Sequence, residues 1–187
     1  MDKTLGKLLE NSKKNKALHP DDIPALDLYM DQIIALMSAH LGRDDDKEPL
    51  TRTMIHNYSK AGLISPVKGK KYTKEHILQM LVIYSLKNTL SIAQIKRVLS
   101  ALSEQEDVGE AELAQCFETQ LARRDTINRQ LTESVDRIMR ENEMKVDTPA
   151  DALSFLLTLT DVTDTLTRFA AAVTQTCFPD PPQKKRK

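Results

Sequence analysis

The chain has 187 residues, of which 40% are hydrophobic and 4% aromatic, with no tryptophan. This composition supports a packed core, argues against intrinsic disorder and against a β-sandwich, and suits one domain or two small ones. No run of about 18 apolar residues occurs, so no membrane span is expected. The first ten residues lack the apolar stretch of a secretory signal, and we therefore expect a cytoplasmic protein.

The formal net charge of zero conceals an uneven distribution of charge along the chain. Residues 51–97 contain nine basic residues and a single acid, Glu75, so this segment carries +8 and the rest of the chain −8. The nine are Arg52, Lys60, Lys68, Lys70, Lys71, Lys74, Lys87, Lys96 and Arg97. A solvated surface usually mixes both signs, so a compact positive segment favours a polyanionic partner over a merely solubilising face.

The spacing of apolar residues predicts the elements of the first half. Residues 1–19 are polar and lysine-rich and are expected to form a flexible N-terminal arm or a short helix. A turn with two prolines precedes a helix over residues 25–41, which Gly42 is placed to end. After a charged loop, a short helix is expected over residues 51–61, with Gly62 as its stop.

An extended segment follows this short helix. Residues 67–72 predict a tight β-hairpin that turns at Gly69. Thr73 is expected to cap a third helix, and Ser91 and Gln94 have the spacing of a capping box at the start of a fourth. The third and fourth helices are expected to bury apolar stripes, namely Ile77, Met80, Leu81 and Tyr84, then Ile95, Val98 and Leu99.

The composition changes after residue 102, where an acidic stretch predicts a hinge before a helical domain at residues 110–178. Two long helices are expected there, the second one beginning at Thr148 and Pro149. Apolar residues of the second helix recur at steps of three and four and predict a surface for a partner helix, formed by Leu159, Val162, Leu166, Phe169 and Val173. In the alternative, the two long helices cover only each other. Residues 179–187 are expected to form a disordered basic tail.

The predicted order of helix, loop, short helix, hairpin and two helices is the layout of a winged helix-turn-helix. Within it, the sequence resembles the MerR family of bacterial transcriptional regulators at the end of the recognition helix, where Tyr58, Gly62, Leu63, Ile64 and Pro66 match the family's pattern. The run Lys70-Lys71-Tyr72-Thr73 is similar to that family's exit from the wing, and residues 90–99 are similar to its fourth helix. The family's Thr-x-Arg-Tyr run is replaced here by Met54-Ile55-His56-Asn57, so the resemblance is to a divergent branch.

The resemblance implies an all-α protein with a small two-stranded β wing. A winged helix-turn-helix at residues 20–102 would place the helix at residues 51–61 in the major groove of double-stranded DNA and the wing at residues 67–72 on its backbone. Arginine, histidine and asparagine hydrogen-bond base edges, whereas lysines contact phosphates. The residues expected to contact DNA are Arg52, Thr53, His56, Asn57, Lys60, Lys68, Lys70, Lys71 and Tyr72.

We expect the protein to act as a homodimer, because a lone winged helix contacts few base pairs. Residues 110–178 would then be the dimerisation domain. The competing class is a protein-interaction adaptor that retains the scaffold without binding DNA. The sequence indicates neither the operator nor an effector.

Other chemistry is not indicated. The four histidines lack the spacing of metal ligands, and the chain has neither a Cys-x-x-Cys pair nor a glycine-rich phosphate loop. We therefore expect no metal, no cofactor and no enzymatic activity. Cys116 and Cys177 are expected to be buried thiols, with a redox role as the less favoured alternative. Tyr58 is expected to pack in the core rather than to contact a phosphate.

Overall fold

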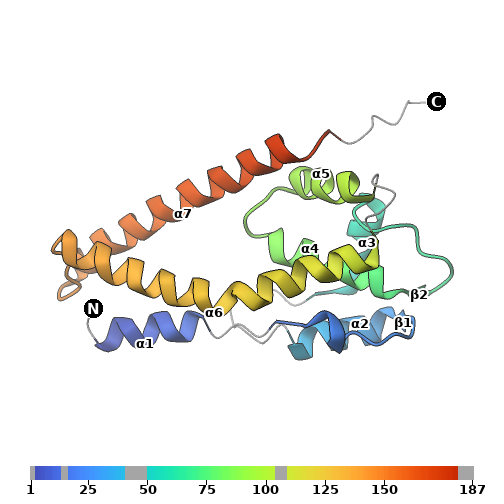
Figure 1. Cartoon of the computed structure of the whole chain (residues 1–187), viewed down its shortest axis with the longest axis horizontal. Coiled ribbons are helices and arrows are strands. Elements are labelled where there is room, and N and C mark those ends of the chain that lie inside the picture. The colour runs from blue at the N-terminus through green and yellow to red at the C-terminus, as the bar shows by residue number, and fades with distance from the viewer. Residues whose placement is uncertain (1–2, 14–16, 41–49, 104–108, 181–187) are drawn as a thin grey trace.

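The structure is a computed structural model that describes residues 3–13, 17–40, 50–103 and 109–180. It is mostly helical, with one two-stranded antiparallel sheet (Figure 1). The elements in chain order are α1 (Lys3–Ser12), the 3-10 helix η1 (Pro20–Asp22), β1 (Leu28–Tyr29), α2 (Met30–His40), α3 (Arg52–Lys60), β2 (Lys71–Tyr72), α4 (Lys74–Leu86), α5 (Ile92–Ser103), α6 (Glu110–Glu141) and α7 (Pro149–Cys177). A mostly helical chain with a small sheet is thus confirmed for the described residues.

Helix α3 begins and ends where the sequence predicts. The Thr51 side chain accepts a hydrogen bond from the Met54 N–H at 3.2 Å, which satisfies one of the free amides of the first turn. At the other end Gly62 has a φ of 70°, a left-handed conformation that glycine adopts without a steric penalty. The N–H groups of Gly62 and Leu63 donate to carbonyls of the last turn, at 3.0 and 2.9 Å. These local bonds fix the length of α3.

The predicted starts of α4, α5 and α7 are also confirmed. Thr73 is the N-cap of α4, and Thr148 caps α7 with Pro149 in the first helical turn. At the start of α5, the Ser91 N–H donates to Gln94 Oε1 at 2.8 Å and the Gln94 N–H donates to Ser91 Oγ at 3.3 Å, which are the two bonds of a capping box. Cap chemistry therefore determines where these elements begin.

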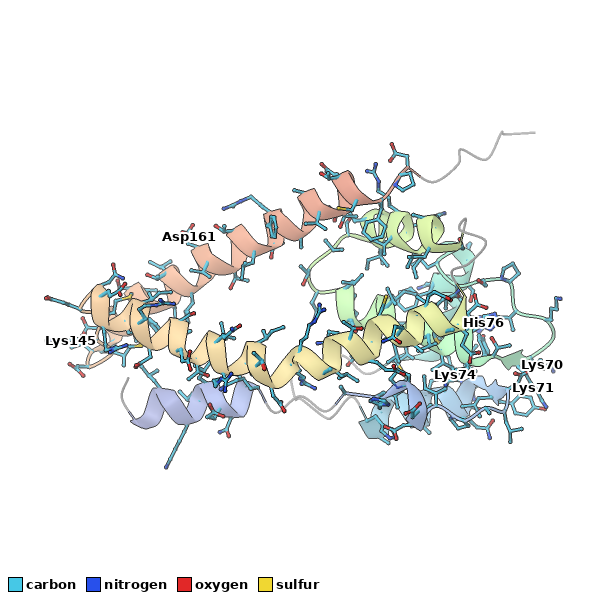
Figure 2. The ribbon with its side chains drawn as sticks, in the orientation of Figure 1. Lys70, Lys71, Lys74, His76, Lys145 and Asp161 are labelled. Carbon is cyan, nitrogen blue, oxygen red and sulfur yellow. The ribbon has the colours of Figure 1, made fainter. Side chains whose placement is uncertain are left out.

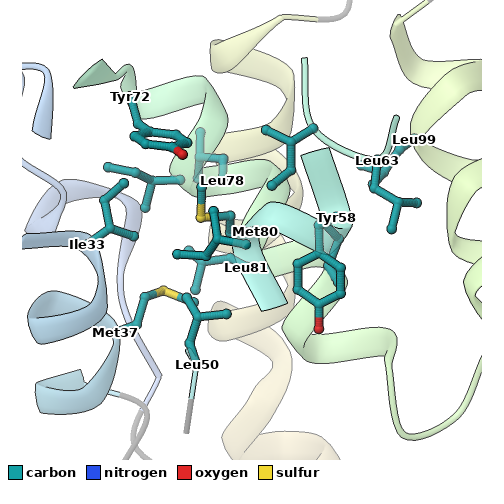
Figure 3. Packing of buried hydrophobic residues seen from close by; sticks show 14 of the residues in the cluster. Ile33, Met37, Leu50, Tyr58, Leu63, Tyr72, Leu78, Met80, Leu81 and Leu99 are labelled. Atoms are coloured by element: carbon teal, nitrogen blue, oxygen red, sulfur yellow. The ribbon is translucent and has the colours of Figure 1, made fainter. Parts of the chain in front are cut away.

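Helix α4 lies at the centre of the core, with seven of its side chains buried, including Ile77, Leu78 and Met80. Helices α2, α3 and α5 surround it and contribute Ile33, Met37, Ile55 and Ile95, none of which is more than 1% exposed (Figure 3). The core continues into the first turns of α6 through Leu113 and Phe117. It therefore crosses the hinge that the sequence predicts after residue 102.

The predicted hairpin at residues 67–72 is wrong. Gly69 does turn the chain, with a φ of 77°, but β2 pairs with β1, with Leu28 opposite Tyr72 and Tyr29 opposite Lys71. The pairing buries Leu28 and Tyr72, which are 9% and 7% exposed, and this burial stabilises the long-range partner over a local one. Strand β1 also delays the helix expected from residue 25, so that α2 begins at Met30.

The N-terminal segment is helical over Lys3–Ser12, which is the second of the two forms expected for it. Helix α1 lies beside α6 (Figure 1), and the Lys13 ammonium that follows it donates to Thr132 Oγ1 of α6. The predicted cap at Gly42, the charged loop around it and most of the basic tail lie outside the described residues. Among the described helices, none is long and apolar enough to cross a membrane.

Helices α6 and α7 diverge from their shared connection, α6 lying on α4 and α7 reaching α5 (Figure 1). The face of α7 predicted for a partner helix is exposed along its length. Its five side chains are from 37% to 67% exposed, and we call them the α7 seam: Leu159, Val162, Leu166, Phe169 and Val173. The alternative in which α6 and α7 cover each other is therefore wrong for this chain.

Candidate nucleic-acid interface

Helix α3 has one buried and one exposed side. Ile55 and Tyr58 are 0% and 8% exposed and attach the helix to the core, so the packing role predicted for Tyr58 is confirmed. The opposite side consists only of polar and basic side chains, all exposed, and these are five of the residues that the sequence singled out: Arg52, Thr53, His56, Asn57 and Lys60. The fold therefore presents these five together to solvent.

The first turn of α3 carries an acidic neighbour that the sequence analysis missed. Arg52 Nη2 lies 2.5 Å from Asp31 Oδ1 of α2, and both side chains are about two-thirds exposed, at 67% and 66%. An ion pair that exposed is worth about 0–1 kcal/mol, so it positions the guanidinium without withdrawing it from a competing anion. The pairing could not be read from the sequence, because it depends on how α2 packs against α3.

Three predicted lysines gather at one end of the molecule. Lys68 and Lys70 flank the turn at Gly69, and Lys71 lies in β2, and all three are exposed (Figure 2 labels two of them). The Lys71 ammonium lies 5.4 Å from the centre of the Tyr29 ring, within the range of a cation–π contact. Tyr29 lies in β1, is 51% exposed and joins this surface.

Tyr72, in contrast, is largely buried. Its ring is 7% exposed and packs among core residues (Figure 3), with the His76 ring edge-on at 5.9 Å. Burial raises the pKa of the Tyr72 hydroxyl above its ordinary value of 10.0. Most of the Tyr72 side chain therefore packs in the core, and its predicted contact with DNA stays a prediction.

Gln79 of α4 anchors the loop between α3 and β2 from the core side. The Gln79 side chain is 6% exposed. The Gln79 amide accepts a bond from the Ser65 N–H at 2.9 Å and donates to Ser65 Oγ at 2.8 Å and to Glu75 Oε1 at 3.0 Å. Because Gln79 makes two hydrogen bonds to Ser65, the start of the loop that carries the lysines near Gly69 is held in place.

A groove of about 680 Å³ lies between α3, this loop and α5. Its walls include His56 and Lys60 from α3, Ser65 and Gly69 from the loop, and Lys96 from α5. The cationic and hydroxyl-bearing side chains that α3 and the loop contribute suit an anionic, hydrogen-bonding ligand such as a phosphodiester backbone.

Two of the nine basic residues of the positive segment are used inside the protein. The Lys96 ammonium donates to the Ala61 carbonyl at 2.7 Å. Arg97 donates from Nε to the Phe178 carbonyl at 2.7 Å and lies 3.1 Å from Asp180 through Nη2. Both residues belong to the basic segment by sequence. In the structure their side chains bond to the C-terminal ends of α3 and α7 rather than extend into solvent.

Sites of other kinds receive little support. No group of three or more potential metal ligands comes together within the described ranges. The prediction that the two cysteines are buried is wrong, since Cys116 and Cys177 are both exposed. Cys116 lies in α6 and Cys177 in the last turn of α7, and helical spacing alone did not reveal their exposure.

The molecule is thus a mostly helical protein with a small antiparallel sheet, whose exposed basic surface is built from α3 and the chain leading into β2. Residues 18–120 match the model of a family described as a domain of unknown function, DUF1836, and the chain belongs to that family. Comparisons with curated proteins and with solved structures give no match. The matched segment contains the core, α3 and β2, whereas α7 lies beyond it.

Proposed function

We propose that this protein is a regulator of transcription that binds double-stranded DNA as a dimer, with α3 in the major groove. The observation that carries the proposal is the exposed side of α3 with Arg52, His56 and Asn57, which lies at the same end of the molecule as the lysines at the turn before β2 (Figures 1 and 2). These side-chain types hydrogen-bond base edges, and an α-helix about 10–12 Å across fits a major groove about 12 Å wide. The resemblance to MerR-like regulators supports the same docking.

The chain around Gly69 supplies the contacts to the DNA backbone. Lys68, Lys70 and Lys71 are exposed at the end of the molecule to which α3 belongs, so they follow a phosphate strand while α3 occupies the groove. Their contribution is independent of base sequence and depends on salt, because each neutralised phosphate releases counterions. Specificity therefore belongs to α3, and a large share of the affinity to the lysines.

Dimerisation is supported by the α7 seam. Soluble monomers rarely leave large contiguous apolar patches in water, and the exposed leucine, valine and phenylalanine side chains of α7 recur at the steps of a helix–helix contact. A second copy of the chain offers the same face, so a two-fold contact is self-complementary. Two copies of α3 would then contact two half-sites.

The experiment that tests the proposed function is selection of sheared genomic DNA by the purified full chain at near-physiological salt, followed by sequencing. Enrichment of fragments that share an inverted repeat is the expected result. Binding that shows no preference among fragments, or no binding, overturns the proposal and favours the adaptor, for which the Arg52–Asp31 pair would be a purely structural contact. The variant Asn57→Ala with Arg52→Ala serves as control, because it removes base contacts and leaves the lysines.

A further inference from the structure

Helix α5 lies between the proposed DNA-contacting helix and the proposed dimerisation helix and is bonded to both. Two consecutive side chains make these bonds. Lys96 donates to the carbonyl of Ala61, the C-cap of α3, and Arg97 donates to the carbonyl of Phe178, the C-cap of α7. Consecutive residues of a helix point about 100° apart, which is why one helix reaches two different neighbours here.

Both bonds are placed where a cation is most effective. The last carbonyls of a helix lack partners within it and carry the negative end of the helix dipole. Lys96 and Arg97 therefore join α5 to the C-terminal ends of α3 and α7. The Arg97 side chain is 21% exposed and also pairs with Asp180, so the contact to α7 has two components.

The attachment to α3 is a direct contact. A Cβ placed on Gly62 would lie 3.6 Å from the Lys96 ammonium, so the amine sits directly against the left-handed turn that ends α3. On its other side, the C-terminal part of α7 packs on the core through Ala170 and Ala171, and Thr174 is 3% exposed. A shift of α7 therefore reaches α5 through packing as well as through Arg97.

We infer that α5 couples the position of α7 to that of α3, so that association of two chains through the α7 seam regulates DNA binding by α3. This inference rests on the proposed DNA binding and self-association. Lys96 and Arg97 are positioning residues in it, since each acts through the helix end that it holds. By linkage, DNA bound to α3 strengthens the association of α7 by the same factor by which association strengthens DNA binding.

Hydrogen exchange of the full chain tests the coupling without DNA. In Arg97→Gln, the exchange rates of the Gly62 and Leu63 amides are expected to rise about threefold to tenfold. These amides lie at the end of α3, whereas the bond that is removed lies at the end of α7. Lys96→Gln, which acts on α3 directly, should raise the same rates. The matched control is Arg168→Gln, whose guanidinium donates to Thr165 Oγ1 on the exposed side of α7. Unchanged rates at Gly62 and Leu63 in Arg97→Gln would overturn the inference.

Two further measurements keep the test decisive. If Arg97→Gln loosens the whole fold, exchange in α6 rises as well. In that case Asp180→Asn is measured instead of Arg97→Gln. Asp180 is 84% exposed, so this substitution removes the ion pair with Arg97 and leaves the Arg97–Phe178 hydrogen bond in place. Rates at Gly62 and Leu63 that match those of the wild type in this variant also count against coupling.

The DNA experiment separates this inference from the proposed function. Arg97→Gln should weaken binding to the selected DNA about threefold to tenfold and Arg168→Gln should not, and the effects of Lys96→Gln and Arg97→Gln should not add. Additive losses mean two independent contacts and contradict the coupling. If the wild-type chain binds no DNA, the proposed function fails, while the exchange rates still decide whether α5 links α7 to α3.

Discussion

Residues 18–120 and helix α7 place their apolar side chains in opposite ways. In the first region the central isoleucine, leucine and methionine side chains of α2 to α5 are almost completely removed from water, as Ile33, Ile77 and Ile95 show at 0% exposed. In α7 comparable side chains remain in solvent, with Leu166 60% and Phe169 67% exposed. The first region, which we call the self-sufficient region, buries these side chains within one chain, whereas the α7 seam is left exposed. The match to DUF1836 covers only the self-sufficient region.

The largest expected effect comes from comparing one truncation in each region. Ile77→Ala removes a fully buried side chain and should lower the free energy of unfolding by about 2–5 kcal/mol. Leu166→Ala should change it by no more than about 0.5 kcal/mol at concentrations where the chain is monomeric. Urea unfolding of both variants measures the difference, and equal losses would show that α7 is already covered within one chain.

The second prediction concerns association. Leu166→Glu with Phe169→Glu places two carboxylates in the α7 seam and should raise the dimer dissociation constant about 30-fold or more, as expected when central apolar contacts are lost. Sedimentation equilibrium measures the constant. Gln175→Glu adds a carboxylate to an exposed polar position of the same helix and should leave it unchanged. A wild-type chain that stays monomeric at high concentration would remove the basis of this prediction.

The third prediction tests the basic surface of the self-sufficient region. Lys70→Glu with Lys71→Glu should weaken binding to all DNA sequences about 10-fold to 100-fold and reduce the slope of log affinity against log salt by about two. A salt titration monitored by fluorescence anisotropy measures both. Lys145→Glu with Arg168→Glu makes the same change of net charge away from α3 (Figure 2 places Lys145 at the opposite end), and an equal loss there would mean that net charge alone matters.

A smaller effect is expected at the ion pair of α3. Arg52→Ala should reduce the preference for specific over random DNA by about tenfold while largely preserving the salt slope. Asp31→Asn removes the partner that Arg52 now contacts and should strengthen DNA binding by a factor of a few, because an exposed pair is weak. Competition binding with the selected and a shuffled sequence compares them, and the division of roles fails if Arg52→Ala weakens both sequences equally.

The smallest effect concerns β2. Because burial raises the folded-state pKa of Tyr72 above 10.0, the folded protein retains this proton at a pH where the unfolded chain loses it. This contribution to stability is present below pH 10 and is lost as the pH rises beyond it. Tyr72→Phe should flatten this decline in unfolding free energy between pH 9 and 11. Parallel pH profiles for variant and wild type would indicate that the Tyr72 hydroxyl is equally solvated in both states.

Local chemistry explains what the sequence predicted correctly. Caps at Thr51, Thr73, Ser91 and Thr148 and the stop at Gly62 depend on groups a few residues apart, and the structure confirms each of them. The exposed side of α3 follows from helical spacing in the same way.

Errors occurred where distant segments meet. Three kinds of contact join residues that are at least 21 positions apart, so no local sequence pattern predicts them. They are the pairing of β1 with β2, the Arg52–Asp31 ion pair, and the hydrogen bonds of Lys96 and Arg97. Tyr72 shows the consequence for the candidate site. A tyrosine beside lysines has the composition of a DNA contact, but the strand partner decides which way its ring faces.

The pairing of β1 with β2 also bears on the order in which the molecule folds. Leu28 and Tyr72 meet across a loop that contains α2 and α3, and closing such a loop costs conformational entropy before the contact contributes anything. Two residue pairs are too few to hold it closed alone, so we expect the sheet to form after α2, α3 and α4 have packed. The lysines near Gly69 would then reach their final positions late, and a nascent chain would acquire its helical core before its complete basic surface.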